Sequence, residues 1–208
     1  PKIYYIDEFM TELSGVTVPE PLTMLFDFYH IYKKTEGENA QPLEEFIRWA
    51  PVLLNDFNEI DSYCADPVQL FNSLNEIRAI ELWNPEFHEL SEFQKQYLHF
   101  WKSLGKLYAE FSEHLKQKKQ AYQGLAYRIA VERIRNPESG IQNPESGFRN
   151  QILFIGFNAL TKAEEIVIRH FAGLGLAEIF WDADSYYIDN QNQEAGKFLR
   201  KYIALPGL

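Results

Sequence analysis

The sequence predicts an α/β fold dominated by helices, in which a partial parallel sheet is interrupted by an all-helical insertion. In the last third of the chain, two short apolar runs at residues 152–155 and 179–181 flank an amphipathic segment. This strand–helix–strand pattern is typical of the units that build parallel sheets. Between residues 20 and 133, apolar residues instead recur at steps of three and four, the spacing of amphipathic helices. Apolar residues make up 46% and aromatic residues 15% of the chain, enough for a buried core.

Length, charge and cysteine content limit the classes of protein to which the chain can belong. A chain of 208 residues forms one or two domains. Its formal net charge of −10 argues against a free-standing binder of phosphate backbones, although a local basic groove is compatible with it. The single cysteine, Cys64, cannot form an intramolecular disulfide, which fits a reducing compartment and predicts a cytoplasmic location.

The sequence contains neither a membrane span nor a secretion signal. No run approaches the roughly 20 apolar residues that cross a bilayer. The first residues, PKIYYIDEF, lack the charged and apolar regions of a secretion signal, so we expect no contact with a membrane. The chain begins without a methionine and ends at ALPGL, and we expect it to be a piece of a longer protein.

The first elements belong to the expected α/β part, which comprises residues 1–19 and 148–208. Residues 2–6 are a short β-prone run. Asp7 is the candidate N-cap of a helix that continues through Leu13 and ends near Gly15.

The expected helical insertion, residues 20–133, contains several amphipathic segments separated by breaks. The clearest segment begins at a capping box, Ser91-x-x-Gln94. Each segment has one apolar stripe, so the segments should pack together as a bundle. The stripe of this segment consists of Phe93, Tyr97, Phe100, Leu104, Leu107, Phe111 and Leu115.

Residues 134–147 are a direct repeat of seven residues, IRNPESG followed by IQNPESG. Asn-Pro and Ser-Gly break helices, which excludes a coiled coil despite the period of seven. The repeat can be interpreted as a peptide-like ligand motif or as a duplicated insertion in a surface loop. We favour the loop, because surface loops tolerate insertions.

The chemistry expected at the end of the first sheet strand is missing. In a nucleotide hydrolase of this plan the strand would end in acidic residues, whereas here it is followed by Gly156, Phe157 and Asn158. Thr161 and Glu164 then form a capping box for the next helix, and a further helix is expected around residues 192–203.

Motifs that bind nucleotides or zinc are absent from the sequence. Neither Gly-x-x-x-x-Gly-Lys-Ser/Thr nor Gly-x-Gly-x-x-Gly occurs. Cys64 stands alone, and the five histidines do not pair at the spacing of zinc ligands. His88 and His99 lie near or on an aromatic helical face, and we interpret them as structural or exposed. We therefore predict no cofactor.

Asp182 and Asp184 follow the second sheet strand and permit two interpretations. Two carboxylates at the mouth of a parallel sheet can share a divalent cation. Residues at a strand end also cap the next turn, which is the interpretation we favour. A nuclease motif of the Asp/Glu-x-Lys type fails here on spacing, because Glu194 and Lys197 are separated by two residues.

Asp56, Glu59 and Asp61 form a second acidic group, on a predicted helix. They could hold a metal ion, but positions five apart do not share a helical face. The apolar neighbours Leu53 and Phe57 favour an ordinary amphipathic helix with a solvated acidic face.

One dense basic cluster, Lys116, Lys118 and Lys119, lies at the end of the long helix. Cations are favoured at a helix C-terminus by the helix dipole, so a solvated helix end is the simpler interpretation. A contact with nucleic-acid phosphates is the alternative, and Arg128 is a further candidate for it.

Three segments occur in an order that carries a family resemblance: LLNDFNEID at 53–61, GLAYR at 124–128 and IGFNALTKAEE at 155–165. The chain resembles the N-terminal half of the inactivated superfamily I helicase subunits, the B-type partners of AddAB-like and RecBCD-like helicase–nucleases. The version resembled is that of the Bacteroidetes-type PD-(D/E)XK nuclease family proteins. The resemblance covers nearly the whole chain apart from the NPESG repeat.

The resemblance implies a role for each region. Residues 2–13 would be a strand and helix of helicase subdomain 1A, a P-loop-NTPase-like sheet, and residues 21–134 the helical 1B insertion. The strand at 152–158 is similar to the Walker B strand, with Gly156 and Phe157 at the places of the magnesium-binding acids. Asp182 would keep the acidic position of the next helicase motif, without the glutamine that usually follows.

The implied function is that of a non-catalytic scaffold and DNA-path element in double-strand break repair and recombination. Its partners would be DNA, bound through the full-length protein, and the other helicase–nuclease subunit. We expect no enzymatic activity from the chain itself. A metal-dependent enzyme using Asp182 and Asp184, or a helical module for protein interaction, are the alternatives.

Overall fold

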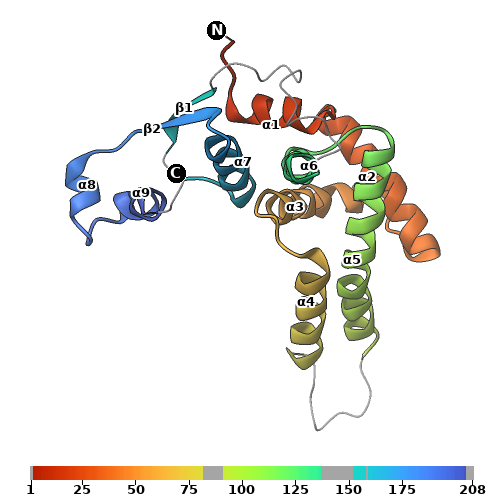
Figure 1. Cartoon of the computed structure of the whole chain (residues 1–208). Coiled ribbons are helices and arrows are strands. Elements are labelled where there is room, and N and C mark those ends of the chain that lie inside the picture. Colours follow the sequence, from red (N-terminus) through yellow and green to blue (C-terminus); the bar gives the residue numbers. More distant parts are fainter. Residues whose placement is uncertain (1, 82–90, 137–151, 158, 205–208) are drawn as a thin grey trace. The chain divides into compact units, whose positions relative to one another are not determined.

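The computed structural model describes residues 2–81, 91–136, 152–157 and 159–204 (Figure 1). Most of the NPESG repeat, together with His88 and Asn158, lies outside the described residues. The chain divides into two compact units. One unit consists of Pro1–Gly15 and Tyr127–Leu208, and the second consists of Val16–Ala126. Among the described residues, no helix is long and apolar enough to span a membrane.

The first unit contains a small parallel sheet. Strands β1 (Ile152–Phe157) and β2 (Ala177–Trp181) pair in parallel, with Phe154 opposite Ile179, and α7 (Lys162–Gly173) connects them. The described part of the chain is therefore dominated by helices with a small parallel sheet, as the sequence predicts. The other elements of this unit are α1 (Ile6–Ser14), most of α6 (Gln123–Arg135), α8 (Ser185–Asp189), a 3-10 turn η3 (Glu194–Gly196) and α9 (Lys197–Ile203).

Helix α7 forms where the sequence places its cap. The hydroxyl oxygen of Thr161 accepts a hydrogen bond from the Glu164 N–H at 3.3 Å, and the Glu164 carboxylate accepts one from the Thr161 N–H at 2.6 Å. This capping box satisfies N–H groups that the helix itself leaves unpaired. The buried face of α7 packs its Phe171 against Phe9 of α1, which also contacts Phe154 of β1, so three elements share one core.

Two expectations for this unit are wrong in detail. Residues 2–5 form no strand, and α1 begins at Ile6 with Tyr5 as its N-cap. The reason is that the Glu8 carboxylate accepts a hydrogen bond from the Tyr5 N–H at 3.0 Å, which places Asp7 inside the first turn. At the other end, the helix expected over residues 192–203 is α-helical from Lys197, after the 3-10 turn η3.

The second unit is a helical bundle around aromatic side chains. Phe28, which is fully buried, lies 5.3 Å from Phe46, 5.9 Å from Phe57 and 4.8 Å from Phe111, measured between ring centroids. These rings come from three helices, so burying them joins segments that are far apart in the sequence. The elements are α2 (Pro21–Glu36), a 3-10 turn η1 (Gly37–Asn39), α3 (Leu43–Ser62), α4 (Pro67–Glu81), α5 (Glu92–Gln117) and the start of α6.

Candidate functional site

The carboxyl end of the sheet is the first candidate site, because parallel sheets bind ligands at this edge. The pairing shifts register between Ile155 and Phe157, which makes Gly156 a β-bulge. Gly156 has a φ of +81°, a conformation that L residues rarely adopt. A Cβ atom added at Gly156 would meet nothing within 4 Å, so backbone conformation rather than space favours glycine there.

One of the two acidic residues after β2, Asp184, serves as a helix cap. Asp184 is the N-cap of α8, and its Oδ1 accepts a hydrogen bond from the Tyr186 N–H at 2.7 Å. Asp182 and Asp184 are both exposed. Within the described residues, no group of three or more histidine, cysteine, aspartate or glutamate side chains is arranged to hold a metal ion. The cap interpretation accounts for Asp184.

The basic cluster at the end of α5 is partly neutralised. Lys116, Lys118 and Lys119 are exposed, and the Lys118 ammonium lies 2.5 Å from a carboxylate oxygen of Asp27 on α2. Lys119 has a φ of +53°, and its carbonyl accepts a hydrogen bond from the Thr17 N–H. Arg128 is half-buried on α6 and belongs to the first unit, whereas the three lysines belong to the second.

The three acidic residues of α3 do not share one solvated face. Asp56 and Glu59 are exposed, as expected of a solvated acidic face, but Asp61 is fully buried. Its carboxylate accepts hydrogen bonds from the hydroxyls of Tyr108, at 2.5 Å, and of Tyr122. Burial, followed by the charge of Asp61, raises the pKa of the Tyr122 hydroxyl well above its ordinary value. Asp61 is therefore a buried structural carboxyl group and not part of a surface cluster.

A pocket of about 630 Å³ in the second unit was not predicted from the sequence. This volume lies within the range of small-molecule sites. The end of α2, the turn η1 and the helices α3 and α5 contribute to its wall. We call it the aromatic pocket, and its lining residues are Tyr32, Glu36, Asn39, Gln41, Trp49, Lys95, His99 and Phe100.

Hydrogen bonds hold part of the wall of the aromatic pocket in place. The Trp49 indole N–H donates to the side-chain oxygen of Gln41 at 2.9 Å, and the Gln41 N–H donates to the Tyr32 hydroxyl at 3.1 Å. The Tyr32 and Trp49 rings meet edge-to-face at 5.3 Å, and Trp49 meets Phe100 in the same way at 5.7 Å. Three aromatic rings from three helices are thus fixed in one wall.

A carboxylate lies beside these rings. The Glu36 side chain is 7% exposed, and its Oε2 lies 2.8 Å from Nε2 of His99, whose side chain is 58% exposed. A buried carboxylate is costly unless it is paired, so this contact stabilises Glu36. The described wall combines aromatic rings with one nearly buried carboxylate, an arrangement that can bind a small molecule.

Comparison with known proteins gives no family assignment. No protein-family model, no curated protein and no solved structure matches the chain.

The residues of the aromatic pocket were visible in the sequence, but not as a group. Tyr32 and Trp49 fit the apolar stripes of their helices, whereas Glu36 lies in residues 35–41, a segment whose composition predicts a break between helices. His99 was expected to be structural or exposed, and it is an exposed partner of Glu36. The structure shows that α2 continues to Glu36, which carries this carboxylate one turn beyond Tyr32.

Proposed function

We propose that the chain is a non-catalytic, helicase-like part of a helicase–nuclease subunit, acting as a scaffold and DNA-path element in double-strand break repair. The observation that carries this proposal is the order of the units along the chain. The helical unit, Val16–Ala126, is inserted between the two segments of the unit that contains the parallel sheet. An insertion of this kind is what the resemblance to superfamily I helicases implies.

The end of β1 supports a role without catalysis. Neither Gly156 nor Phe157 can hold magnesium or orient a water molecule, which is the task of the Walker B acids in an active enzyme. The positive φ of Gly156 favours glycine over residues with a side chain at that position. An ATP-hydrolysing function would need acids from elsewhere.

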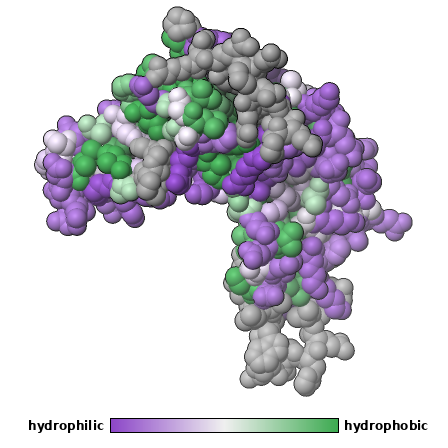
Figure 2. Space-filling model, in the orientation of Figure 1, coloured by the Kyte–Doolittle hydropathy of each residue, from purple (hydrophilic) through white to green (hydrophobic). Residues whose placement is uncertain are grey.

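The exposed apolar side chains on one face of the sheet support a scaffold role. Leu153 and Ile155 of β1 and Phe180 of β2 are each more than half exposed, while Phe154 between them is buried. Parallel sheets are normally covered on both faces, so further protein is expected to pack on this one. Figure 2 shows hydrophobic residues gathered over the region where Figure 1 places β1, β2 and α7.

The proposed contact with DNA is weak and electrostatic. The net charge of −10 opposes binding, and Lys118 is already paired with Asp27, so we take the exposed Lys119 as the residue of this cluster to test. Non-specific binding to DNA typically has a Kd of about 10⁻⁶–10⁻⁴ M and weakens steeply with salt. A cytoplasmic location is part of the proposal.

Fluorescence anisotropy with a labelled, single-strand-tailed duplex tests the DNA contact. At about 25 mM salt we expect binding that Lys119→Glu weakens about fivefold, because one phosphate contact becomes repulsive. Lys102→Glu is the matched control, since Lys102 is an exposed lysine on α5 that lies outside the cluster. Absence of binding at this salt concentration, or equal losses in the two variants, would contradict the proposed DNA path.

A further inference from the structure

We propose that the aromatic pocket binds a small organic cation of the alkylammonium or guanidinium class. This inference is independent of the helicase-like function, because it rests only on the contacts within the second unit. It assigns a ligand chemistry to Tyr32, Glu36, Trp49 and Phe100.

The aromatic wall of the pocket favours a cation. Cations bind over aromatic ring faces within about 6 Å of the centroid, and several rings set at angles make the usual cage for a quaternary ammonium group. Here the planes of Tyr32 and Trp49 lie at 75° to each other, and those of Trp49 and Phe100 at 84°. Such rings do not stack flat on one another. The hydrogen bonds through Gln41 fix two of them in advance, which lowers the entropy cost of binding.

The second argument is the carboxylate. Glu36 is nearly buried, and a carboxylate has about four acceptor sites on its two oxygens. His99 uses Oε2, while Oε1 has no hydrogen-bond partner among the described residues. An ammonium or guanidinium group can donate to this oxygen and compensate the buried charge at the same time.

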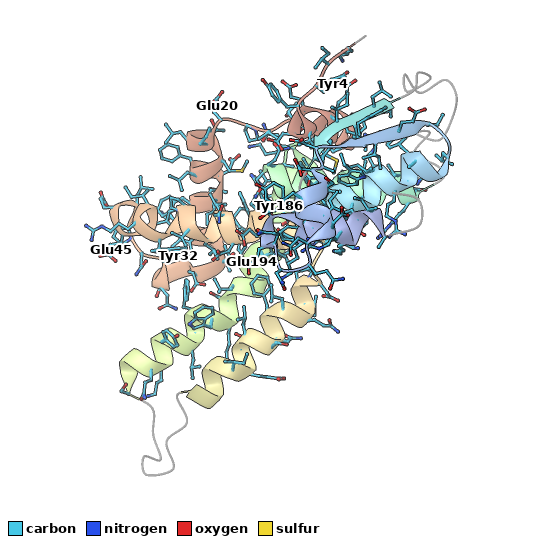
Figure 3. The ribbon with its side chains drawn as sticks, turned by 90° about the vertical axis from the view of Figure 1, so that its left-hand side faces the viewer. Tyr4, Glu20, Tyr32, Glu45, Tyr186 and Glu194 are labelled. Atoms are coloured by element: carbon cyan, nitrogen blue, oxygen red, sulfur yellow. The ribbon has the colours of Figure 1, made fainter. Side chains whose placement is uncertain are left out.

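The third argument is the local electrostatic field. Burial raises the pKa of the Tyr32 hydroxyl and the hydrogen bond from Gln41 opposes this, while the charges of Glu36 and, more weakly, Glu45 raise the pKa further. Two carboxylates therefore act on this wall. Glu45 and Tyr32 are labelled in Figure 3. Lys95 and His99 also line the pocket and favour an anion, but the more buried charge is that of Glu36. Because electrostatic interactions strengthen with burial, Glu36 decides the preference.

The Trp49 indole N–H provides a direct readout of binding. Its signal in a ¹H–¹⁵N spectrum is assigned by its loss in Trp49→Phe, and the indole signals of Trp101 and Trp181 serve as internal references. The probes are tetramethylammonium and argininamide, with tert-butanol as the neutral analogue and benzoate as the anion. We expect both cations to shift the Trp49 signal saturably, and the neutral and anionic probes to leave it unchanged.

Variants test whether Glu36 carries the affinity. Glu36→Gln should weaken binding of the cations about tenfold or more, since a desolvated charge contact is lost. Glu38→Gln is the matched control, because it removes an exposed carboxylate from the adjacent turn η1 and should change nothing. If Glu36→Gln does not fold, Phe100→Leu replaces it and should also weaken binding.

Three results would overturn the proposal. The first is the absence of a saturable shift with either cation. The second is a shift with tert-butanol or benzoate that matches the shift with the cations, because the pocket would then select for size or for negative charge. The third is that Glu36→Gln, or Phe100→Leu in its place, binds the cations with an affinity within about twofold of the unaltered chain. A twofold change is smaller than the loss of a charge contact would cause.

Discussion

Replacing Tyr122 by phenylalanine should destabilise the second unit through one hydrogen bond. The Tyr122 hydroxyl donates to the fully buried Asp61 carboxylate, and its ring stacks on Phe111 with centroids 6.1 Å apart. Phenylalanine keeps this stacking and the buried apolar area, so the loss is confined to the hydroxyl. A hydrogen bond to a charged group contributes about 1.5–3 kcal/mol, and we expect the free energy of unfolding to fall by that amount.

Urea denaturation followed by far-UV circular dichroism measures the change. Tyr108→Phe should behave like Tyr122→Phe, since Tyr108 donates to the same carboxylate at 2.5 Å. Tyr63→Phe is the matched control, because Tyr63 is 57% exposed, and it should stay within about 0.5 kcal/mol of the unaltered chain. If all three variants had the same small effect, the Asp61 carboxylate would not be held by the two buried tyrosines, and the description of this core would be wrong.

Three further predictions follow from single positions. Gly156→Ala should lower the free energy of unfolding by about 1–2 kcal/mol, because alanine is disfavoured at a φ of +81°. Gly173→Ala, in the last turn of α7, should raise it by up to about 1 kcal/mol, because a Cβ atom there also meets nothing within 4 Å. Urea denaturation measures both changes, and changes in the same direction would contradict the bulge at Gly156. Burial lowers the pKa of His170 below 6.5, so the unfolded chain binds a proton at a higher pH than the folded chain does. The free energy of unfolding should therefore fall as the pH drops below 6.5, and this fall should be smaller in His170→Phe. Gly124→Ala should lower the free energy of unfolding by at least about 2 kcal/mol, because its Cβ would lie 2.1 Å from the carbonyl oxygen of Asn58. A melting temperature equal to that of the unaltered chain would show that this contact relaxes freely.

The sequence predicts local structure best where one short segment contains the whole cause. The capping boxes at Ser91 and Gln94 and at Thr161 and Glu164 are present in the structure, because each joins residues three apart. The two apolar runs pair as parallel strands for a similar reason, since the helix between them returns the chain to the same sheet edge. At Gly156, sequence reasoning considered only the missing acid, and the structure adds a bulge that itself favours glycine.

Features that depend on distant residues could not be predicted in the same way. Asp61 follows Leu53 and Phe57 at steps of four, which places it on the buried face, but its acceptability there depends on Tyr108 and Tyr122. The prediction from sequence placed Asp61 on the solvated acidic face, because the two tyrosines that hold it lie far away in the chain. The aromatic pocket is a stronger case, because its wall combines residues from 32 to 100 on three helices. Such a site exists only once the bundle has packed.

ATP turnover tests the central claim of a helicase-like fold without catalytic groups. The purified chain is incubated with ATP and magnesium, with and without the tailed duplex, and phosphate release is measured. We predict no hydrolysis above the buffer rate in either sample, because β1 ends in Gly156 and Phe157 instead of acids. Hydrolysis that rises with DNA and is lost in Asp182→Asn would contradict the claim, since it would make Asp182 part of an active metal-dependent site.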